Sequence, residues 1–597
     1  MRVIFKRALV LVLLSVLAGG AVCHTAASSP QTAPVSQPAS APQSTVPAVS
    51  PSGAKSAAPA APAKTITTTS RKPAKPKLTA RQKQAIDILQ SVEGDLGRYS
   101  PQMQAYLLQE MASAYKDLNH AQQITLLKEA FQAAANMPEG DQRTEQQNSI
   151  VHDLDDADPS ALLSLQNSSD PKVRETVLRL LIKDDIDRGR LPSAVSRLTQ
   201  WDASLAYPYE EAKRAIAKLN AQQAGERQSV FSSALAAFRT SDEAIEPDNK
   251  VTELITDSYS TLPPAMVVDA VETVLNKAQK QQEAQQDVHM TLTVGGKKGQ
   301  ATFNNLYDFE LFQLLPVLSK LDPAKAEALQ RDDANVAALT KKYPDGASSL
   351  DPGPSGLGMM ISVSDSGSAP SPPNPMVQQM QTAQAIEASA AKDPGSAIAS
   401  AQTLSNTADW EYAAMTPRCR VLERIAREAV RRKDYATAHS AMQALAAAIQ
   451  DLPLLAQAHY LAQMAALSAE MGETQTANQY LSKGMKAADG VYQKDAFADP
   501  ANDACKALWP SAVAWKALLI LTARIDPAHA LQESASLPDP EIEAVANVAI
   551  AGVLLDQEPG MTTISVSHNG KEEVRMMSDV PWWNVPKSGG GSGQTGQ

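Results

Sequence analysis

The fold is decided by the stretch Lys433-Asp434-Tyr435-Ala436-Thr437-Ala438, a short polar turn that leads into an alanine-rich segment. Ala438 lies twelve residues after Ala426, and the turn stands between them. Two antiparallel helices joined by a short turn need small side chains where their axes approach most closely. The spacing therefore predicts a helical hairpin in which Ala426 and Ala438 lie at the contact between the two helices.

The same spacing recurs on both sides of this stretch. Ala385 and Ala397 are twelve residues apart around Lys392-Asp393-Pro394, and Ala465 and Ala477 are twelve apart around Gly472-Glu473-Thr474. The first alanines of the three pairs follow one another at steps of 41 and 39 residues. We therefore expect three hairpins in tandem, with all six alanines packed between helices.

This pattern resembles the tetratricopeptide repeat, whose two small-residue positions are also twelve apart across the turn. The resemblance covers about 110 residues and departs from the family in two ways. The steps are longer than the usual repeat of about 34 residues, and Leu, Met or Ala mostly fill the large aromatic positions. It implies an α-solenoid shape at superfamily level.

A second repeat lies earlier in the chain. Pro159-Ser160-Ala161-Leu162 recurs as Pro192-Ser193-Ala194-Val195, a period of 33 residues that is typical of stacked helical hairpins. Asp-Pro pairs at Asp322, Asp393 and Asp526 favour helix starts, because Asp caps orphan N–H groups and Pro suits the first helical position. These signals predict helices well beyond the three alanine pairs.

Two short stretches favour β-hairpins. Residues 288–303 place β-branched residues on both sides of a Gly-rich turn. Near the C-terminus, apolar and polar residues alternate on both sides of Asn569-Gly570, the strongest short-range hairpin signal. The predicted fold class is all-α, an α-α hairpin repeat solenoid in two helical blocks with two small β-hairpin excursions and disordered N-terminal and C-terminal segments.

Composition shifts divide the chain into seven segments. We expect a signal peptide (1–23), a disordered Pro/Ala/Ser-rich linker (24–78), a helical repeat block (79–342), a Pro/Gly/Ser-rich linker (343–375), a tetratricopeptide-like helical block (376–556), a β-hairpin with a Trp-Trp segment (557–587) and a disordered tail (588–597).

The N-terminus predicts export. Arg2, Lys6 and Arg7 precede fifteen largely apolar residues ending at Val22, which is short for a bilayer span of about 20 residues. Cys23 follows as a lipoprotein cysteine would, so membrane attachment through a lipid anchor at Cys23 or through the signal segment is the alternative to a periplasmic or secreted protein. In an oxidising compartment Cys419 and Cys505 could form a disulfide, or remain two buried thiols.

The net charge and the spacing of the polar residues argue against several functional classes. A net charge of −11 argues against a nucleic-acid partner, which requires a basic face. His439 and His459 lie in neighbouring segments without metal-ligand spacing. The cluster Asp153, Asp155, Asp156 and Asp158 lacks the calcium-loop pattern, and we interpret it as acidic residues at a helix N-terminus. The sequence predicts no catalytic, cofactor-binding or metal-binding residue.

The resulting hypothesis is an exported scaffold, not an enzyme, that binds a protein or peptide partner along a helical-repeat surface in the cell envelope or outside the cell. One alternative is a hydrolase or lyase that acts on a cell-wall or extracellular polymer with carboxylates from distant helices. Another is a structural spacer without a specific ligand.

Overall fold

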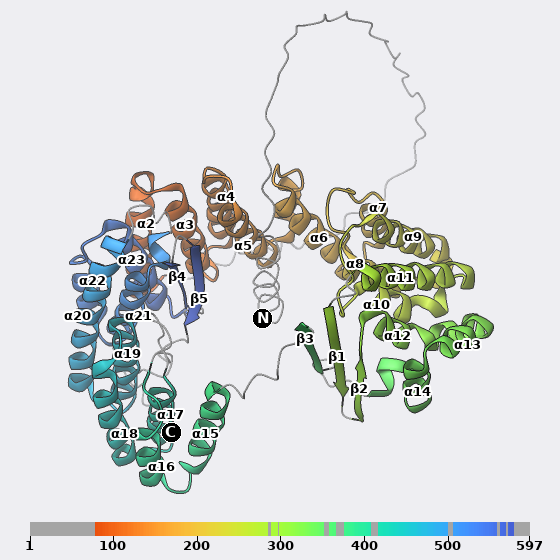
Figure 1. Ribbon diagram of the computed structural model, residues 1–597. Helices are drawn as coiled ribbons and strands as arrows, with labels where there is room; N and C mark the ends of the chain where they lie inside the picture. Colours follow the sequence, from red (N-terminus) through yellow and green to blue (C-terminus); the bar gives the residue numbers. More distant parts are fainter. Residues whose placement is uncertain are drawn as a thin grey trace, which may run out of the picture. The chain divides into compact units, whose positions relative to one another are not determined.

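Helices dominate the computed structural model of the chain, in agreement with the predicted all-α class (Figure 1). The structure describes residues 78–284, 288–296, 298–350, 358–365, 375–407, 416–498, 505–557, 562–568 and 571–577. The predicted signal peptide, Cys23, nearly all of the first linker, the Trp-Trp segment and the C-terminal tail lie outside these residues. Among the described residues, no helix combines the length and the apolarity needed to cross a bilayer.

The helices follow one another with short connections. Those before the first sheet are α2 (Ala80–Asp95), α3 (Pro101–Tyr115), α4 (His120–Ala135), α5 (Asp141–Ala157), α6 (Pro171–Asp187), α7 (Leu191–Thr199), α8 (Tyr209–Lys218), α9 (Ala224–Thr240), α10 (Lys250–Ser258) and α11 (Pro264–Ala284). Short 3₁₀ turns separate several of them: η1 (Leu96–Arg98), η2 (Pro159–Ser164), η3 (Ala221–Gln223) and η4 (Tyr259–Thr261).

The later helices form the second half of the list. They are α12 (Leu306–Leu321), α13 (Pro323–Asp332), α14 (Ala334–Lys342), α15 (Pro375–Ser389), α16 (Pro394–Gln402), α17 (Pro417–Arg431), α18 (Tyr435–Ala448), α19 (Leu454–Glu470), α20 (Thr474–Ala498), α21 (Pro510–Ile525), α22 (Pro527–Ser534) and α23 (Pro540–Leu554), with η5 (Gly346–Leu350), η6 (Ile449–Asp451) and η7 (Lys506–Leu508).

The expected helix starts have the expected chemistry. Asp322, Asp393 and Asp526 each accept hydrogen bonds from backbone N–H groups in the first turn of α13, α16 and α22, and a proline stands at the start of each helix. An N-cap of this kind stabilises a helix by about 1 kcal/mol. The same device also begins α6 and α23 at Asp170 and Asp539.

Both predicted β-hairpins are present. Strands β1 (Val288–Gly296) and β2 (Gly299–Phe303) pair antiparallel, as do β4 (Thr562–His568) and β5 (Lys571–Met577). A third strand, β3 (Gly358–Asp365), pairs with β1 and gives the order β2-β1-β3. The sequence assigned this stretch to a linker because Pro and Gly flank it, although Met359 to Ser364 contain none of these breakers.

The buried side chains form three clusters whose limits differ from the two expected blocks. One cluster runs from Ala85 to Leu181 and continues from Leu455 to Leu554, a second runs from Ile182 to Leu350, and a third from Ala383 to Leu467. The helix α6 therefore contributes to two cores, because Leu181 belongs to the first and Ile182 to the second.

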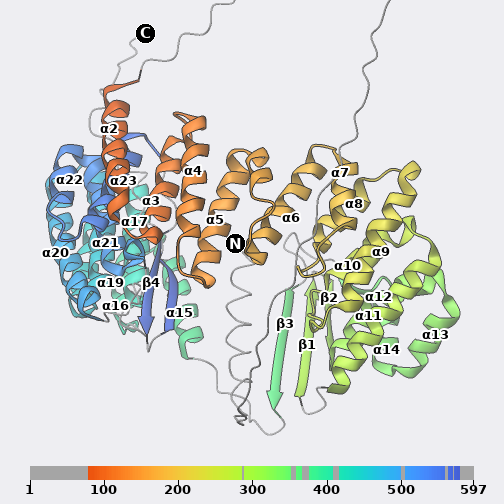
Figure 2. The same ribbon diagram turned by 90° about the horizontal axis from the view of Figure 1, so that it is seen from above.

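The first cluster joins helices from opposite ends of the chain. Helices α2 and α3 pack against α23, and both views show α2 beside α23 (Figures 1 and 2). Lys516 of α21 forms an ion pair with Glu110 of α3 at 3.0 Å, and the Gln557 side chain donates to the carbonyl of Ala114 at 2.8 Å. Helices α2 and α3 therefore share one core with α21 and α23.

Candidate functional site

The alanine pairs lie where α17–α18 and α19–α20 pack as hairpins. Ala426, Ala438, Ala465 and Ala477 are all at most 1% exposed. A glycine fills the same role where α20 packs against α21. A Cβ on Gly484 would lie 2.6 Å from the Leu518 side chain of α21. Small residues thus allow the close approach of these helices.

The turns of these two hairpins have the same backbone conformation. Lys433 and Gly472 occupy the left-handed region, with φ of 60° and 83°. The next residue then donates its N–H back across the turn, from Asp434 to the carbonyl of Ala429 at 2.9 Å and from Glu473 to that of Ser468 at 2.8 Å. This is the Schellman arrangement that ends a helix in a sharp reversal.

The α15–α16 hairpin differs from this pattern. Ala397 is buried, but Ala385 is exposed, and the buried residues of α15 between Thr382 and Ser389 are Ala383 and Ile386. The physical reason is the turn: Asp393 N–H bonds to the carbonyl of Ser389 four residues earlier, and residues 390–393 include no left-handed residue. The different reversal presents another face of α15 to α16.

A polar cluster lies between α17 and α19, next to the buried alanines. Arg427 forms an ion pair with Glu423 on its own helix and donates to the Gln463 side chain of α19 at 3.2 Å. Its Nε is buried without a hydrogen-bond partner among the described residues. His459 lies buried on the same helix as Gln463.

Burial governs the protonation of this cluster. It lowers the pKa of His459 to about 4, and the nearby Arg427 cation acts in the same direction. Burial also raises the pKa of Glu423, although Arg427 opposes the shift. His459 is therefore a neutral imidazole at neutral pH, and Arg427 is the cation at the centre of the cluster.

Four arginines of α17 share one helix face, which we call the arginine stripe: Arg420, Arg424, Arg427 and Arg431. They are spaced i, i+4, i+7 and i+11, while Leu422, Ile425, Ala429 and Val430 are buried. The helix carries five arginines and two glutamates, a net charge of +3 in a chain whose total is −11. The sequence analysis missed this stripe, although its spacing is visible in the residues.

Two arginines of the stripe form ion pairs with carboxylates that are less exposed than they are. Arg424 pairs with Glu387 of α15, and the Arg424 side chain is 50% exposed whereas that of Glu387 is 16% exposed. Arg427 and Glu423 show the same order, with 29% and 11%. Arg424 thus pairs with a partly buried carboxylate and Arg427 with a buried one, and the half-exposed Arg424 guanidinium can donate to carbonyl or carboxylate acceptors.

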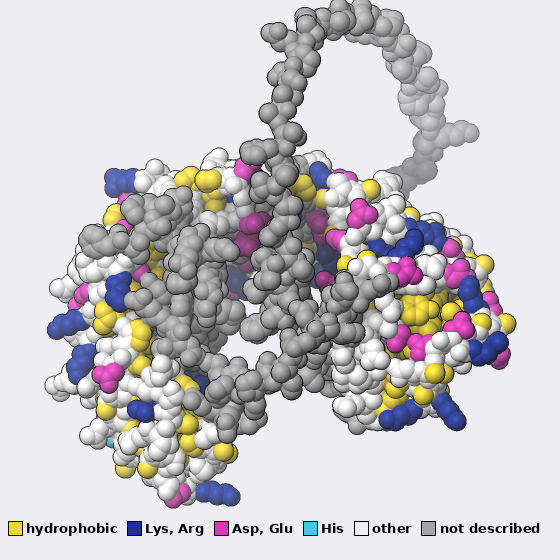
Figure 3. Space-filling model, in the orientation of Figure 1, with side chains coloured by type: hydrophobic (Ala, Val, Ile, Leu, Met, Phe, Trp, Pro, Cys, Tyr) yellow, Lys and Arg dark blue, Asp and Glu magenta, His cyan; other side chains and the backbone are white. Residues whose placement is uncertain are grey.

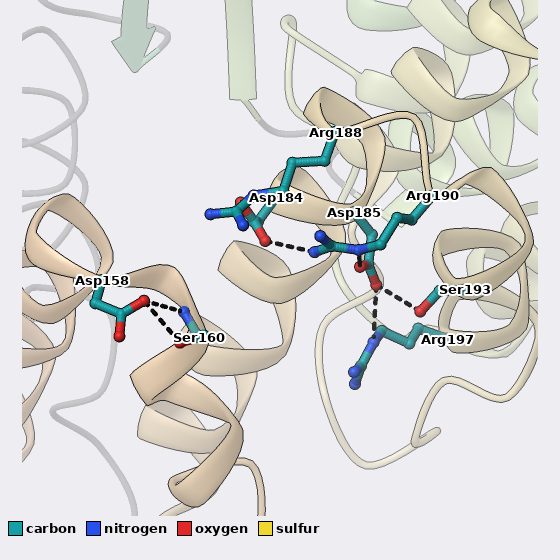
Figure 4. A network of polar contacts seen from close by, with 8 residues as sticks. All are labelled: Asp158, Ser160, Asp184, Asp185, Arg188, Arg190, Ser193 and Arg197. Atoms are coloured by element: carbon teal, nitrogen blue, oxygen red, sulfur yellow. Dashed lines mark hydrogen bonds and ion pairs between the residues drawn. The ribbon is translucent and has the colours of Figure 1, made fainter. Parts of the chain in front are cut away.

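A second polar network stabilises the turn between α6 and α7, which also has a left-handed residue, Gly189 (Figure 4). Asp185 accepts hydrogen bonds from Ser193 at 2.6 Å and from Arg190 at 2.7 Å, while Arg197 pairs with it at 3.3 Å. Burial alone would raise the pKa of Asp185, but the bonds from Ser193 and Arg190 outweigh it and lower this pKa. The network therefore fixes the turn between these two helices.

The predicted acidic cluster divides between two helix ends: Asp158 caps the start of η2, as interpreted, whereas Asp153, Asp155 and Asp156 lie at the C-terminus of α5, where the interpretation was wrong. Helix α5 begins at Asp141 and ends at Ala157, which places Asp153, Asp155 and Asp156 in its last turns. Asp153 accepts from Gln109, and Asp155 pairs with Lys183 at 3.5 Å. Pairing with neighbouring helices holds these carboxylates there despite the unfavourable helix dipole.

The remaining candidate residues do not converge. Cys419 and Cys505 are both buried and no disulfide joins them. His439 contacts Glu473 at 2.9 Å, away from the buried His459. Among the described residues, no group of three or more His, Cys, Asp or Glu side chains could hold a metal ion.

Comparisons with known proteins do not assign the chain to a family. No protein-family model and no curated protein matches the chain. A solved structure described as a circular tandem repeat protein with novel repeat topology and enhanced subunit contact surfaces is similar over 80% of this chain and 89% of its own, at 12% identity and a TM-score of 0.15. The helical-repeat character of the chain therefore rests on its own hairpins.

Proposed function

We propose that this chain is an exported helical-repeat scaffold that binds a protein or peptide partner, and that the arginine stripe of α17 contacts that partner. The observation that carries the proposal is a row of four arginines on one face of α17, two of them paired with buried or partly buried carboxylates, in an acidic protein. Repeat arrays commonly recognise partners through extended surfaces formed by successive helices.

The exposed surface favours polar recognition. Among the residues whose burial the structure describes, the exposed large hydrophobic side chains are Leu78, Leu163 and Tyr435. Basic and acidic side chains are interspersed over the face visible in Figure 3. Because arginine forms charge-assisted hydrogen bonds with carboxylates, we infer an extended, acidic peptide segment as the partner.

Fluorescence anisotropy tests this proposal with a fluorescein-labelled octapeptide of alternating glutamate and alanine. The double variant Arg424→Glu, Arg431→Glu should weaken binding at least tenfold, because two attractive charges become repulsive. The affinity of the wild-type protein should fall with added salt.

The control variant makes the same charge change elsewhere. Arg98 and Arg239 are exposed arginines of η1 and α9, so Arg98→Glu, Arg239→Glu alters net charge equally without touching the stripe. Binding equally weakened in both double variants would mean that net charge alone attracts the peptide and would overturn the assignment of the stripe. Circular dichroism establishes that each variant is folded.

A further inference from the structure

Glu310 lies inside the second core, on the first turns of α12. Its side chain is completely buried. One carboxyl oxygen, Oε2, accepts from the Thr252 hydroxyl of α10 at 2.5 Å, and the other, Oε1, is buried without a hydrogen-bond partner among the described residues. The only donors that act on this carboxyl group among the described residues are the neutral side chains of Thr252 and Asn249, whereas an ionised group would need several strong donors or a cation.

Among the described residues, the groups that act on the Glu310 carboxyl include no cation. They are Thr252 of α10 and its N-cap residue Asn249, and both are neutral. In β1 from Thr291 onward and in β2, the buried side chains are Leu292, Val294, Ala301 and Phe303, and η5 buries Leu350.

Charged residues on the neighbouring helices are engaged elsewhere. Lys325 of α13 pairs with Glu272 of α11. Lys320 of α12 donates to the Tyr259 hydroxyl at 2.9 Å, and Asp333 of α14 faces Asp308.

Both acids of this turn hold their protons more tightly than usual. Burial raises the pKa of Glu310 to about 8, and hydrogen bonds from Thr252 and Asn249 only partly oppose it. Burial, followed by the nearby Asp333 carboxylate, raises the pKa of Asp308 to about 6. Helix α12 also contacts β1 and β2, and the ring centroid of Phe303 in β2 lies 5.3 Å from that of Phe309 and 5.2 Å from that of Phe312, with the rings tilted.

We propose that Glu310 is a proton-dependent latch between α10 and α12, closed when its carboxyl group is neutral and loosened when it ionises. An ionised Glu310 would place an uncompensated charge beside Thr252, which favours local opening that hydrates the group. Because α12 carries the sheet through Phe303, opening of the latch also loosens β1 and β2. The latch lets pH set the rigidity of the packing between α10, α12 and the sheet.

The sign of the pH dependence follows from the linkage between proton binding and the closed state. A glutamate with a raised pKa binds more protons in the closed state than in the open state, so the closed state is favoured below the ordinary pKa of 4.5 and loses this advantage as pH rises through about 8. The opening equilibrium should therefore grow about tenfold for each pH unit between 5 and 8, and level off above 8.

Hydrogen–deuterium exchange of the full chain between pH 5 and pH 9, corrected for the intrinsic exchange rate, measures this opening. Amide protection in α10 and α12 should fall about tenfold per unit up to pH 8. In Glu310→Gln, whose side chain is neutral at every pH, the profile should be nearly flat, and at pH 8 its protection should exceed that of the wild type.

Two further variants test whether the pH dependence comes from Glu310 itself. Thr252→Val removes a bond that favours the ionised carboxylate, so the levelling point should move above pH 8. Glu272→Gln alters the half-exposed pair with Lys325 and should leave the profile unchanged. A wild-type profile without pH dependence, or an unchanged slope in Glu310→Gln, would overturn the latch.

Discussion

The hairpins α17–α18 and α15–α16 carry the same alanine spacing but pack differently. In the first, a left-handed Lys433 reverses the chain sharply and both alanines are buried. In the second, the turn has no left-handed residue, and Ala385 is exposed although Ala397 is buried. The comparison teaches that spacing selects candidate contacts, whereas the turn decides which face of the first helix meets the second.

The largest expected effect comes from placing a long cation at each of the two first-helix alanines. Ala426→Arg should destabilise the protein by about 4 kcal/mol or more, because the guanidinium can find neither space nor solvent there. Ala385→Arg should change stability by less than about 0.5 kcal/mol, because this position is exposed. Thermal unfolding followed by circular dichroism compares the two. Equal losses in the two variants would contradict the different packing.

A smaller effect concerns the buried histidine of α19. Its pKa is lowered to about 4, so the unfolded chain binds more protons between pH 4 and the ordinary pKa of 6.5. Stability should fall as pH drops through this window, by up to about 3 kcal/mol from His459.

Urea titrations at several pH values measure this loss, and His459→Asn should remove it. Asp308 and Glu310 titrate with the opposite sign, so the difference between variant and wild type isolates the histidine. Parallel stability curves for the two proteins would show that His459 does not titrate as a buried group.

The smallest effect tests the turns themselves. Lys433→Gly should stabilise the protein by about 0.5 kcal/mol, since glycine relieves the left-handed strain but loses more entropy on folding. Lys392→Gly, in the α15–α16 turn, should destabilise it by a similar amount because no strain is relieved there. Chemical denaturation at one pH measures both. Shifts of the same sign would refute the role assigned to the turn.

The sequence predicted the helical class, the capped helix starts and both β-hairpins because these depend on local chemistry. Asp393-Pro394 caps a helix wherever it stands, and Asn569-Gly570 favours a turn between any two alternating runs. The position of Ala385 could not be predicted, because it depends on the backbone path of a turn whose residues, Lys392 and Asp393, resemble Lys433 and Asp434. Strand β3 was missed for a related reason, since its partner β1 lies about 70 residues earlier.

The candidate site was predictable only in part. The spacing of Arg420, Arg424, Arg427 and Arg431 is readable as one helix face, but the acids that support it come from several places. Glu387 belongs to another helix, and the burial of His459 and Gln463 depends on how α17 and α19 meet. Such tertiary neighbours are not encoded in the local pattern.

The shared core of the first and last helices has a consequence for how the protein is made. Helices α2 and α3 emerge from the ribosome hundreds of residues before α21 and α23, against which they pack. The parts of their apolar faces that meet α21 and α23 stay uncovered until those helices are made, and contacts between such distant segments form slowly. Removal of α21–α23 would therefore also expose apolar surface on α2 and α3.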